Sequence, residues 1–112
     1  MEDDMAKPLV RMVKLNGLQY NANRDPAVYR RAVGEAFRLQ ALLEGSGSAQ
    51  CSVIDARGKM LASQTLQRPA TFSCELKFDQ PGSQVVTLEV RSGAERFAQD
   101  LRLDVLAHAW VG

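Results

Sequence analysis

Apolar and polar residues alternate with a period of two along much of the second half of the chain. The pattern covers residues 72–78, 86–90 and 101–105, where Phe, Cys, Leu and Val alternate with Ser, Thr and charged residues. Successive side chains of a β-strand point to opposite faces of a sheet, so each run predicts a strand with one buried and one exposed face. The last of these strands is expected to span about residues 96–106.

Two further extended segments and a hairpin are predicted upstream. Residues 9–15 form a first strand that ends at Asn16-Gly17, a dipeptide that tolerates positive φ. Residues 50–55 and a strand beginning at residue 60 form a hairpin around a turn that contains Gly58. The expected register of this hairpin places Asp55 opposite Met60, Ile54 opposite Leu61, and Val53 opposite Ala62.

The segment from residue 26 to residue 44 supports two interpretations. Asp25-Pro26 reads as a helix N-cap followed by a first-turn proline, and Gly45 would end such a helix. Alternatively, a strand begins at Glu35, with its inward positions at Phe37, Leu39, Ala41 and Leu43. Glycine inside a helix costs about 1 kcal/mol relative to alanine, so Gly34 weakens the helical interpretation. The strand is favoured, with at most one short helical turn near residues 26–33.

Counting these segments gives seven strands at short, regular spacing. Residues 45–48 are predicted as a flexible loop, and Arg68-Pro69 is predicted to break the chain between two strands. Seven short strands in about a hundred residues are typical of an antiparallel β-sandwich, with a barrel as the nearest alternative. We therefore expect an all-β protein, with residues 1–8 as a flexible tail and residues 9–112 as a single domain.

Two sequence runs resemble bacterial immunoglobulin-like domains. They are Ala-Val-Gly-Glu-Ala-Phe-Arg-Leu at residues 32–39 and Asp-Gln-Pro-Gly-Ser-Gln-Val-Val-Thr-Leu-Glu-Val at residues 79–90. In that family a glycine-containing turn introduces the B strand and a Pro-Gly-Ser turn introduces the F strand. The resemblance covers about residues 30–106 and implies a seven-stranded antiparallel immunoglobulin-like sandwich. It lacks the central tryptophan, the tyrosine corner and the usual cysteine spacing, so it transfers no functional residue.

Charge and hydropathy narrow the possible partners. Fourteen Lys and Arg residues balance thirteen Asp and Glu residues, and the two signs are interleaved, which argues against nucleic acid as a partner. No apolar stretch approaches the roughly 20 residues that a membrane-spanning helix needs, so we expect a soluble protein. Residues 1–8 carry no apolar signal-peptide core. A periplasmic or secreted location is favoured if a signal peptide has been removed, and a cytoplasmic location otherwise.

The residues that usually perform catalysis or bind metals are few. His108 is the single histidine and lies near the end of the sequence, where a surface position is expected. Cys51 and Cys74 fall on the inward positions of their strands, either as small buried hydrophobes or as a disulfide across the core. A structural zinc site takes four Cys or His ligands, and the chain has three such residues. We expect no catalytic set, no metal and no cofactor, and hence no enzyme.

Apolar residues on a face predicted to be exposed are the best candidates for binding. Ile54 and Leu61 are such a pair in the predicted hairpin, and Trp110 is a third candidate because tryptophan is enriched at binding hot spots. The sequence therefore favours a non-catalytic binding or spacer module that recognises a protein partner, as part of an envelope or secreted assembly. The alternative is a small-ligand carrier or sensor, with its pocket in the core or beneath the arginine-rich segment that includes Arg30, Arg31 and Arg38.

Overall fold

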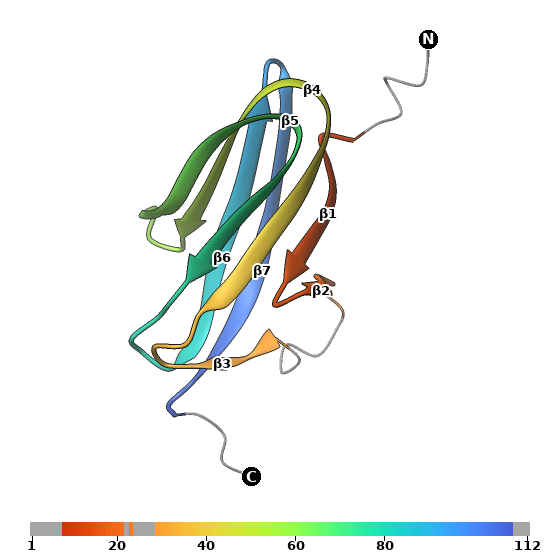
Figure 1. Cartoon of the computed structure of the whole chain (residues 1–112). Coiled ribbons are helices and arrows are strands. Elements are labelled where there is room, and N and C mark those ends of the chain that lie inside the picture. The colour runs from red at the N-terminus through yellow and green to blue at the C-terminus, as the bar shows by residue number, and fades with distance from the viewer. Residues whose placement is uncertain (1–7, 22, 24–28, 109–112) are drawn as a thin grey trace.

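The computed structural model describes residues 8–21, 23 and 29–108, and within them every regular element is a β-strand (Figure 1). The strands are β1 (Val10–Leu15), β2 (Leu18–Gln19), β3 (Arg31–Ala32), β4 (Phe37–Asp55), β5 (Met60–Leu76), β6 (Gly82–Ser92) and β7 (Glu95–Leu106). The predicted all-β class is therefore confirmed. Residues 1–7 of the predicted tail lie outside the described residues, as do residues 26–28 of the predicted helical turn, whereas residues 31 and 32 form a strand.

The strands form one mixed sheet in the order β2-β1-β4-β6-β7-β3, and β5 pairs with β4. All pairs are antiparallel except β3 and β7, which run parallel, so the prediction of a wholly antiparallel sheet is wrong. The parallel pair forms because the chain passes beside the end of β7 before it turns into β4, and the amide of Val33 donates to the carbonyl of Leu106 at 2.9 Å. Gly34, at a φ of +83°, then reverses the chain.

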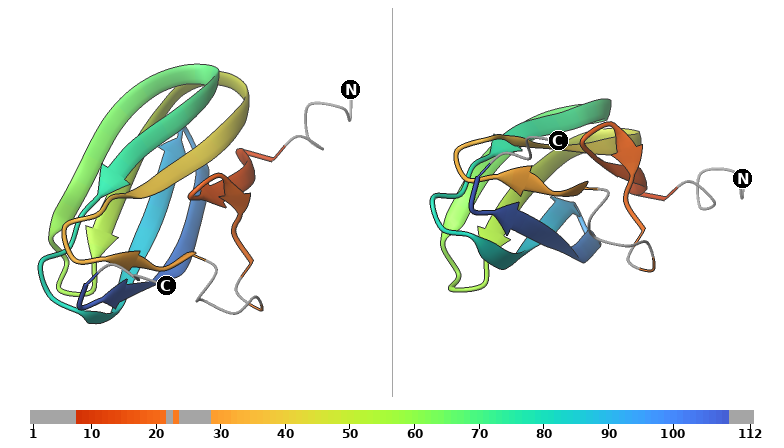
Figure 2. Two further views of the ribbon diagram at one scale, coloured as in Figure 1. Left: turned by 60° about the horizontal axis from the view of Figure 1, so that its bottom comes forward. Right: turned by 90° about the horizontal axis from the view of Figure 1, so that it is seen from below.

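The long strands β4 and β5 curl the sheet over on itself (Figure 2). Residues 37–43 of β4 pair with β1 and with the second half of β5, whereas residues 47–55 pair with β6 and with the first half of β5. The register of β4 and β5 shifts between Leu43 and Gly47, and Gly45 and Gly47 have φ values of +92° and +98°. These glycines bend the strand without ending it, because positive φ costs glycine no steric strain.

Two predictions made from local sequence are wrong because the long strands continue through the curl. Residues 45–48 belong to β4 and are not a flexible loop, and Arg68-Pro69 lies within β5 and does not separate two strands. The seven observed strands are therefore not the seven predicted ones. Four predicted strands merge pairwise into β4 and β5, and the very short strands β2 and β3 bring the observed total to seven.

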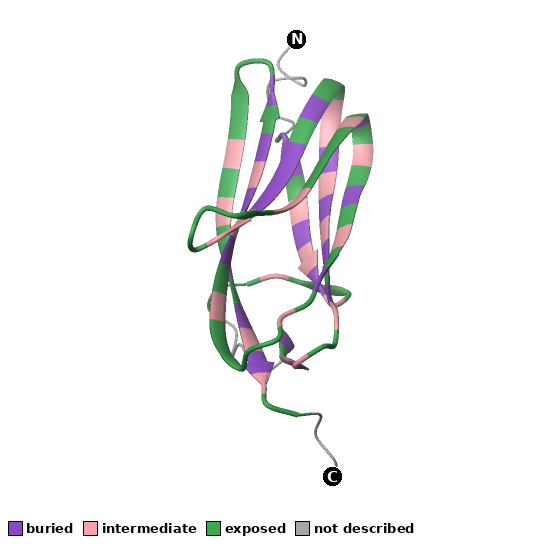
Figure 3. Cartoon of the chain, turned by 90° about the vertical axis from the view of Figure 1, so that its left-hand side faces the viewer, coloured by how far each residue is buried: buried purple, intermediate pink, exposed green. Residues whose placement is uncertain are grey.

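The core lies between the facing parts of the curled sheet, and burial alternates along the strands (Figure 3). The strand interpretation of residues 37–43 is confirmed, with Phe37, Leu39, Ala41 and Leu43 all buried. Because inward residues recur with a period of two, one face of each strand supplies the core. The largest fully buried side chains are Leu15, Tyr29, Phe37, Leu39, Cys51, Val53, Phe72, Val86, Leu88, Val90, Leu101 and Leu103.

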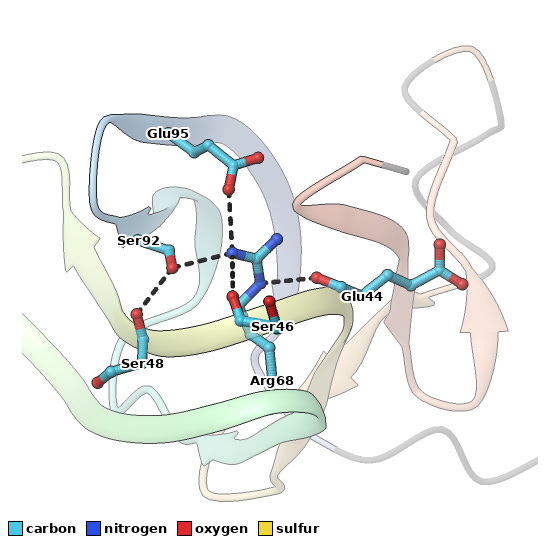
Figure 4. Close-up of polar contacts among 6 residues, drawn as sticks. All are labelled: Glu44, Ser46, Ser48, Arg68, Ser92 and Glu95. Atoms are coloured by element: carbon cyan, nitrogen blue, oxygen red, sulfur yellow. Dashed lines mark hydrogen bonds and ion pairs between the residues drawn. The ribbon is translucent and has the colours of Figure 1, made fainter. Parts of the chain in front are cut away.

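A buried arginine joins the bend of β4 to the turn between β6 and β7 (Figure 4). The side chain of Arg68 is 4% exposed. Its Nε donates to the Glu44 carbonyl at 2.6 Å, and its Nη1 donates to the Ser46 carbonyl at 3.1 Å, Ser92 Oγ at 2.9 Å and Glu95 Oε1 at 3.0 Å. Ser92 Oγ in turn donates to the Ser48 carbonyl at 2.7 Å. Arg68 thus takes up carbonyl groups that the bend withdraws from regular strand pairing.

Candidate functional site

The turn between β4 and β5 is built around the side chain of Asp55. Its Oδ1 accepts the backbone N–H groups of Arg57 at 2.9 Å and Lys59 at 2.8 Å, and the amide of Asp55 donates to the Lys59 carbonyl at 2.9 Å. An aspartate that accepts amides two residues further along the chain is a common way to stabilise a tight turn. Asp55 therefore faces Lys59 across the turn, one residue earlier than the sequence predicted.

The register of the hairpin shifts by one residue directly after this turn. Val53 lies opposite Ala62 as predicted, but Ile54 lies opposite Met60 and not opposite Leu61. The shift leaves Leu61 as the extra residue of a β-bulge. Since side chains alternate between faces, the bulge changes which residue of β5 accompanies Ile54.

The structure places the three predicted binding residues in three different settings. Ile54 lies on the outer face of the sheet, where it lines a hollow together with Met60. Leu61 packs against the core and lines a different hollow. Trp110 lies outside the described residues. The predicted pair of Ile54 and Leu61 is therefore not brought together, and Met60 takes the place that was assigned to Leu61.

The outer-face hollow has a volume of about 350 Å³, and we refer to Ile54 and Met60 within it as the hairpin patch. Met60 is 55% exposed and is the most exposed large apolar side chain among the described residues. Glu89 and Arg91 form the rim on β6, with 3.7 Å between their charged groups. The remaining lining residues are Gln50 and Ser52. The patch thus combines the exposed Met60 and the half-buried Ile54 with a rim that carries one charge of each sign.

One of the two residues of the hairpin patch could be predicted from local sequence. Ile54 was identified because it is apolar at an exposed position, and the same reasoning would have selected Met60 if the bulge had been placed at Leu61. The bulge depends on the bonds that Asp55 makes to Arg57 and Lys59, because these bonds set the length of the turn. An Asp-Ala-Arg-Gly-Lys segment is compatible with more than one turn length, so the register was not determined locally.

A second hollow of about 540 Å³ lies at the end of the molecule that holds the β4–β5 turn. Its charged lining residues are Asp55, Arg57, Lys59, Lys77 and Asp79. None of the three cationic groups has a carboxylate within 4.0 Å among the residues that the structure describes. Two carboxylates and three cations give the hollow a small positive excess, and we refer to it as the basic hollow.

Both cysteines are free thiols in the structure, with Cys51 fully buried. Burial raises the pKa of Cys51, and it raises the pKa of Cys74 to about 11. Thiols with raised pKa values stay protonated at neutral pH and are poor nucleophiles. Both thiols are free in the structure, as in the interpretation as small inward hydrophobes, with Cys51 fully buried and Cys74 half-buried.

The chemistry available on the described surface is limited. Within residues 8–21, 23 and 29–108, no group of three or more His, Cys, Asp or Glu side chains is arranged to bind a metal ion. His108 is exposed at the end of this range. No helix in the described part of the chain is long and apolar enough to cross a bilayer.

Comparison with known proteins gives no family for this chain. No protein-family model matches it, and no curated protein is significantly similar to it.

Proposed function

We propose that this protein is a non-catalytic binding module that recognises a protein partner through the hairpin patch. The supporting observation is the cross-strand pair of Ile54 and Met60, which presents apolar surface on the outer face of the sheet. Full burial of a methionine or isoleucine side chain contributes about 1.5–3 kcal/mol. Met60 is 55% exposed, so a partner that covers it gains on the order of 1 kcal/mol from this side chain alone.

The rim of the patch specifies the chemistry of the partner. The Arg91 side chain is 59% exposed and the Glu89 side chain is 30% exposed, so a partner with one acidic and one basic group can pair with both. An apolar side chain that enters the hollow between them would cover Ile54 and Met60. Exposed ion pairs contribute little to affinity but penalise partners with like charges, so the rim favours specificity. A place in an envelope or secreted assembly is part of this proposal.

The test uses a photo-crosslinking amino acid at Met60, with the same group at Leu18 as the matched control. Leu18 lies on β2 and is 43% exposed, so it provides an apolar surface position away from the patch. Crosslinking in the source cells should give a product from position 60 and not from position 18. Ile54→Ser and Met60→Ser together should remove that product when a neighbouring patch position carries the crosslinker. Equal products from both positions, or none from position 60, would contradict the proposal.

A small-ligand carrier is the second candidate, and the basic hollow is the observation that favours it. Arg57, Lys59 and Lys77 line this hollow without a carboxylate close enough for an ion pair among the described residues. A carboxylate or phosphate ligand would supply the missing negative charge. A ligand present at 100 times its Kd should stabilise the fold by about 2.7 kcal/mol, which a thermal-shift screen detects. Loss of that shift in Lys77→Ala, but not in Met60→Ser, would assign the ligand to the basic hollow.

The relationship to bacterial immunoglobulin-like domains also stands as a proposal. It is supported by the two turns on which the resemblance rests. Gly34, at a φ of +83°, precedes β4, and Gly82, at a φ of +121°, begins β6. Binding modules are common among β-sandwich folds, but a fold alone does not specify a partner.

A further inference from the structure

Among the residues that the structure describes, no other strand pairs with one side of β7 before Val105. It pairs with β6 over residues 95–105 without any shift of register, whereas β3 covers its other side only at Val105 and Leu106 (Figure 2). An uncovered strand presents a row of unpaired N–H and C=O groups, which is a template for pairing with another strand.

Two hydrogen bonds show which residues of β7 point their backbone groups to the free side. The carbonyl of Leu106 accepts from Val33, and the amide of Arg102 donates to Tyr20 Oη at 3.1 Å. In a strand, the N–H and C=O of one residue point to the same side, and the side alternates from residue to residue. The even-numbered residues therefore face the free side, and Arg96, Ala98 and Asp100 form the stretch that no described residue covers with a backbone bond.

We propose that this stretch pairs with β7 of a second copy of the chain, antiparallel and around a two-fold axis at Ala98. In this register Arg96 lies opposite Asp100 of the second copy, and the same pair recurs on the other side of the axis. The backbone groups of all three residues then form hydrogen bonds between the two copies. A two-fold axis requires a self-complementary surface, and a strand with one cation and one anion at equal distances from a small central residue is self-complementary.

The local charges support this register. Arg96 lies directly opposite Arg91 on β6, and like charges on directly opposite residues are destabilising. Among the described residues, no carboxylate lies within 4.0 Å of the Arg96 guanidinium. Asp100 is exposed and accepts a hydrogen bond from Thr87 at 2.7 Å. In the dimer, Asp100 of the second copy would therefore lie beside Arg96, which within its own sheet lies beside another cation, Arg91.

Neighbouring registers are less favourable. A shift of two residues in one direction places Arg96 opposite Arg102. A shift of four places Asp100 opposite itself and, although it brings Arg96 opposite Asp104, it needs the backbone of Arg102, whose amide donates to Tyr20. A shift of six would pair Asp100 with Arg102, but the amide of Arg102 already donates to Tyr20. A shift of two in the other direction pairs Arg96 with Ala98 and forms no ion pair. The proposed register is thus favoured by its own Arg96–Asp100 pairs and by the like-charge contacts or blocked backbone groups of the other registers.

Among the described residues, β5 is the other long strand with one free side, and it is less suited to such a pair. Its register with β4 shifts twice, and Pro69 in its middle has no N–H to donate. By contrast, β7 is regular over the whole stretch that the dimer would use. The inference goes beyond the proposed partner binding, because Ile54 and Met60 lie on β4 and β5, two and three strands away from β7.

The test is sedimentation velocity on the full chain across a wide concentration range, with charge variants at the two paired positions. The wild type should form a species of twice the 12.3 kDa chain mass. Arg96→Asp and Asp100→Arg should each weaken self-association by about tenfold or more, because two attractive pairs become repulsive at once. An equimolar mixture of the two variants should dimerise again, since every cross-strand pair is then opposite in charge. The double variant Arg96→Asp/Asp100→Arg should also dimerise by itself.

A backbone variant tests whether self-association uses this edge of β7 and not another surface. Ala98→Pro removes an N–H that faces the free side and leaves the pairing with β6 intact, so it should give a folded monomer. Circular dichroism and thermal unfolding check that each variant is folded. A wild type that stays monomeric throughout would overturn the proposal. So would a dimer that is unaffected by Ala98→Pro, or two charge variants that fail to restore each other when mixed.

Discussion

Replacing the buried Arg68 by methionine should destabilise the protein by about 2–3 kcal/mol. Methionine keeps most of the apolar stem but removes the donors that reach the Glu44 and Ser46 carbonyls and Ser92 Oγ. A buried acceptor left without a partner costs about 1–3 kcal/mol. The Ser46 residue is exposed, so water replaces part of its bond, and most of the loss comes from the Glu44 carbonyl and the Ser92 hydroxyl.

The salt bridge to Glu95 contributes little to this figure. The Glu95 side chain is 52% exposed, and ion pairs of that kind are worth about 0–1 kcal/mol. Glu95→Gln is therefore the matched control, since it removes the charge and leaves an acceptor in place. Its expected effect on the free energy of unfolding is below about 1 kcal/mol.

Urea unfolding followed by circular dichroism measures both variants, and an unchanged m-value would show that the comparison is one of stability. We expect a large loss in the free energy of unfolding for Arg68→Met and a small one for Glu95→Gln. If Arg68→Met loses less than about 1 kcal/mol, the carbonyls of the bend find other partners and Arg68 does not stabilise the curl. If Glu95→Gln loses as much as Arg68→Met, the ion pair and not the carbonyl bonds supplies the stability.

Three further predictions concern the glycines and the thiols. Gly45→Ala should destabilise the fold more than Gly58→Ala in urea unfolding: both glycines have positive φ, but only at Gly45 would a Cβ lie 2.5 Å from Nη2 of Arg68. Equal losses would show that the close approach is harmless. The free energy of unfolding should fall as the pH rises from 9 toward 11. Burial raises the pKa of the Cys74 thiol to about 11, so the folded protein keeps this proton in a pH range where the unfolded chain has already lost it. The contribution of Cys74 to this fall is at most about 2 kcal/mol, since the thiol is only partly buried. Cys74→Ser should remove this contribution. An unchanged pH dependence of the free energy of unfolding in this variant would contradict the assignment of the fall to Cys74. Cys51, which is fully buried, should resist alkylation in the native protein and react after unfolding, as mass spectrometry would show.

The strands and their buried faces could be predicted where alternation was unbroken. Phe37, Leu39, Ala41 and Leu43 were assigned to a strand and to its inward face by their spacing alone, and all four are buried. The same holds for the alternating residues of β6 and β7. Burial of apolar side chains every second residue is a local property of a strand with one covered face, so the sequence carries it directly.

The candidate site was predicted only in part, because a bulge changes which side chains share a face. Ile54 was predicted for the exposed face, and the structure places it half-buried on the outer face beside Met60 and not beside Leu61. One inserted residue reverses the facing of the residues between it and the turn, here Met60, and leaves Ala62 opposite Val53 as predicted. The bonds from Asp55 that set this register belong to the folded turn, and the alternation pattern does not contain them.

By itself, the sequence determined that this protein is all-β, which residues of its unbroken alternating runs point inward, and that its cysteines lie on inward positions. Only the tertiary structure decided that residues 45–48 and Arg68-Pro69 continue their strands, and that β3 joins the sheet in parallel. The physical reason is the range of the interactions involved. Alternation is read within a few residues, whereas the bend at Gly45 is stabilised by Arg68, which bonds residues more than 20 positions away in either direction.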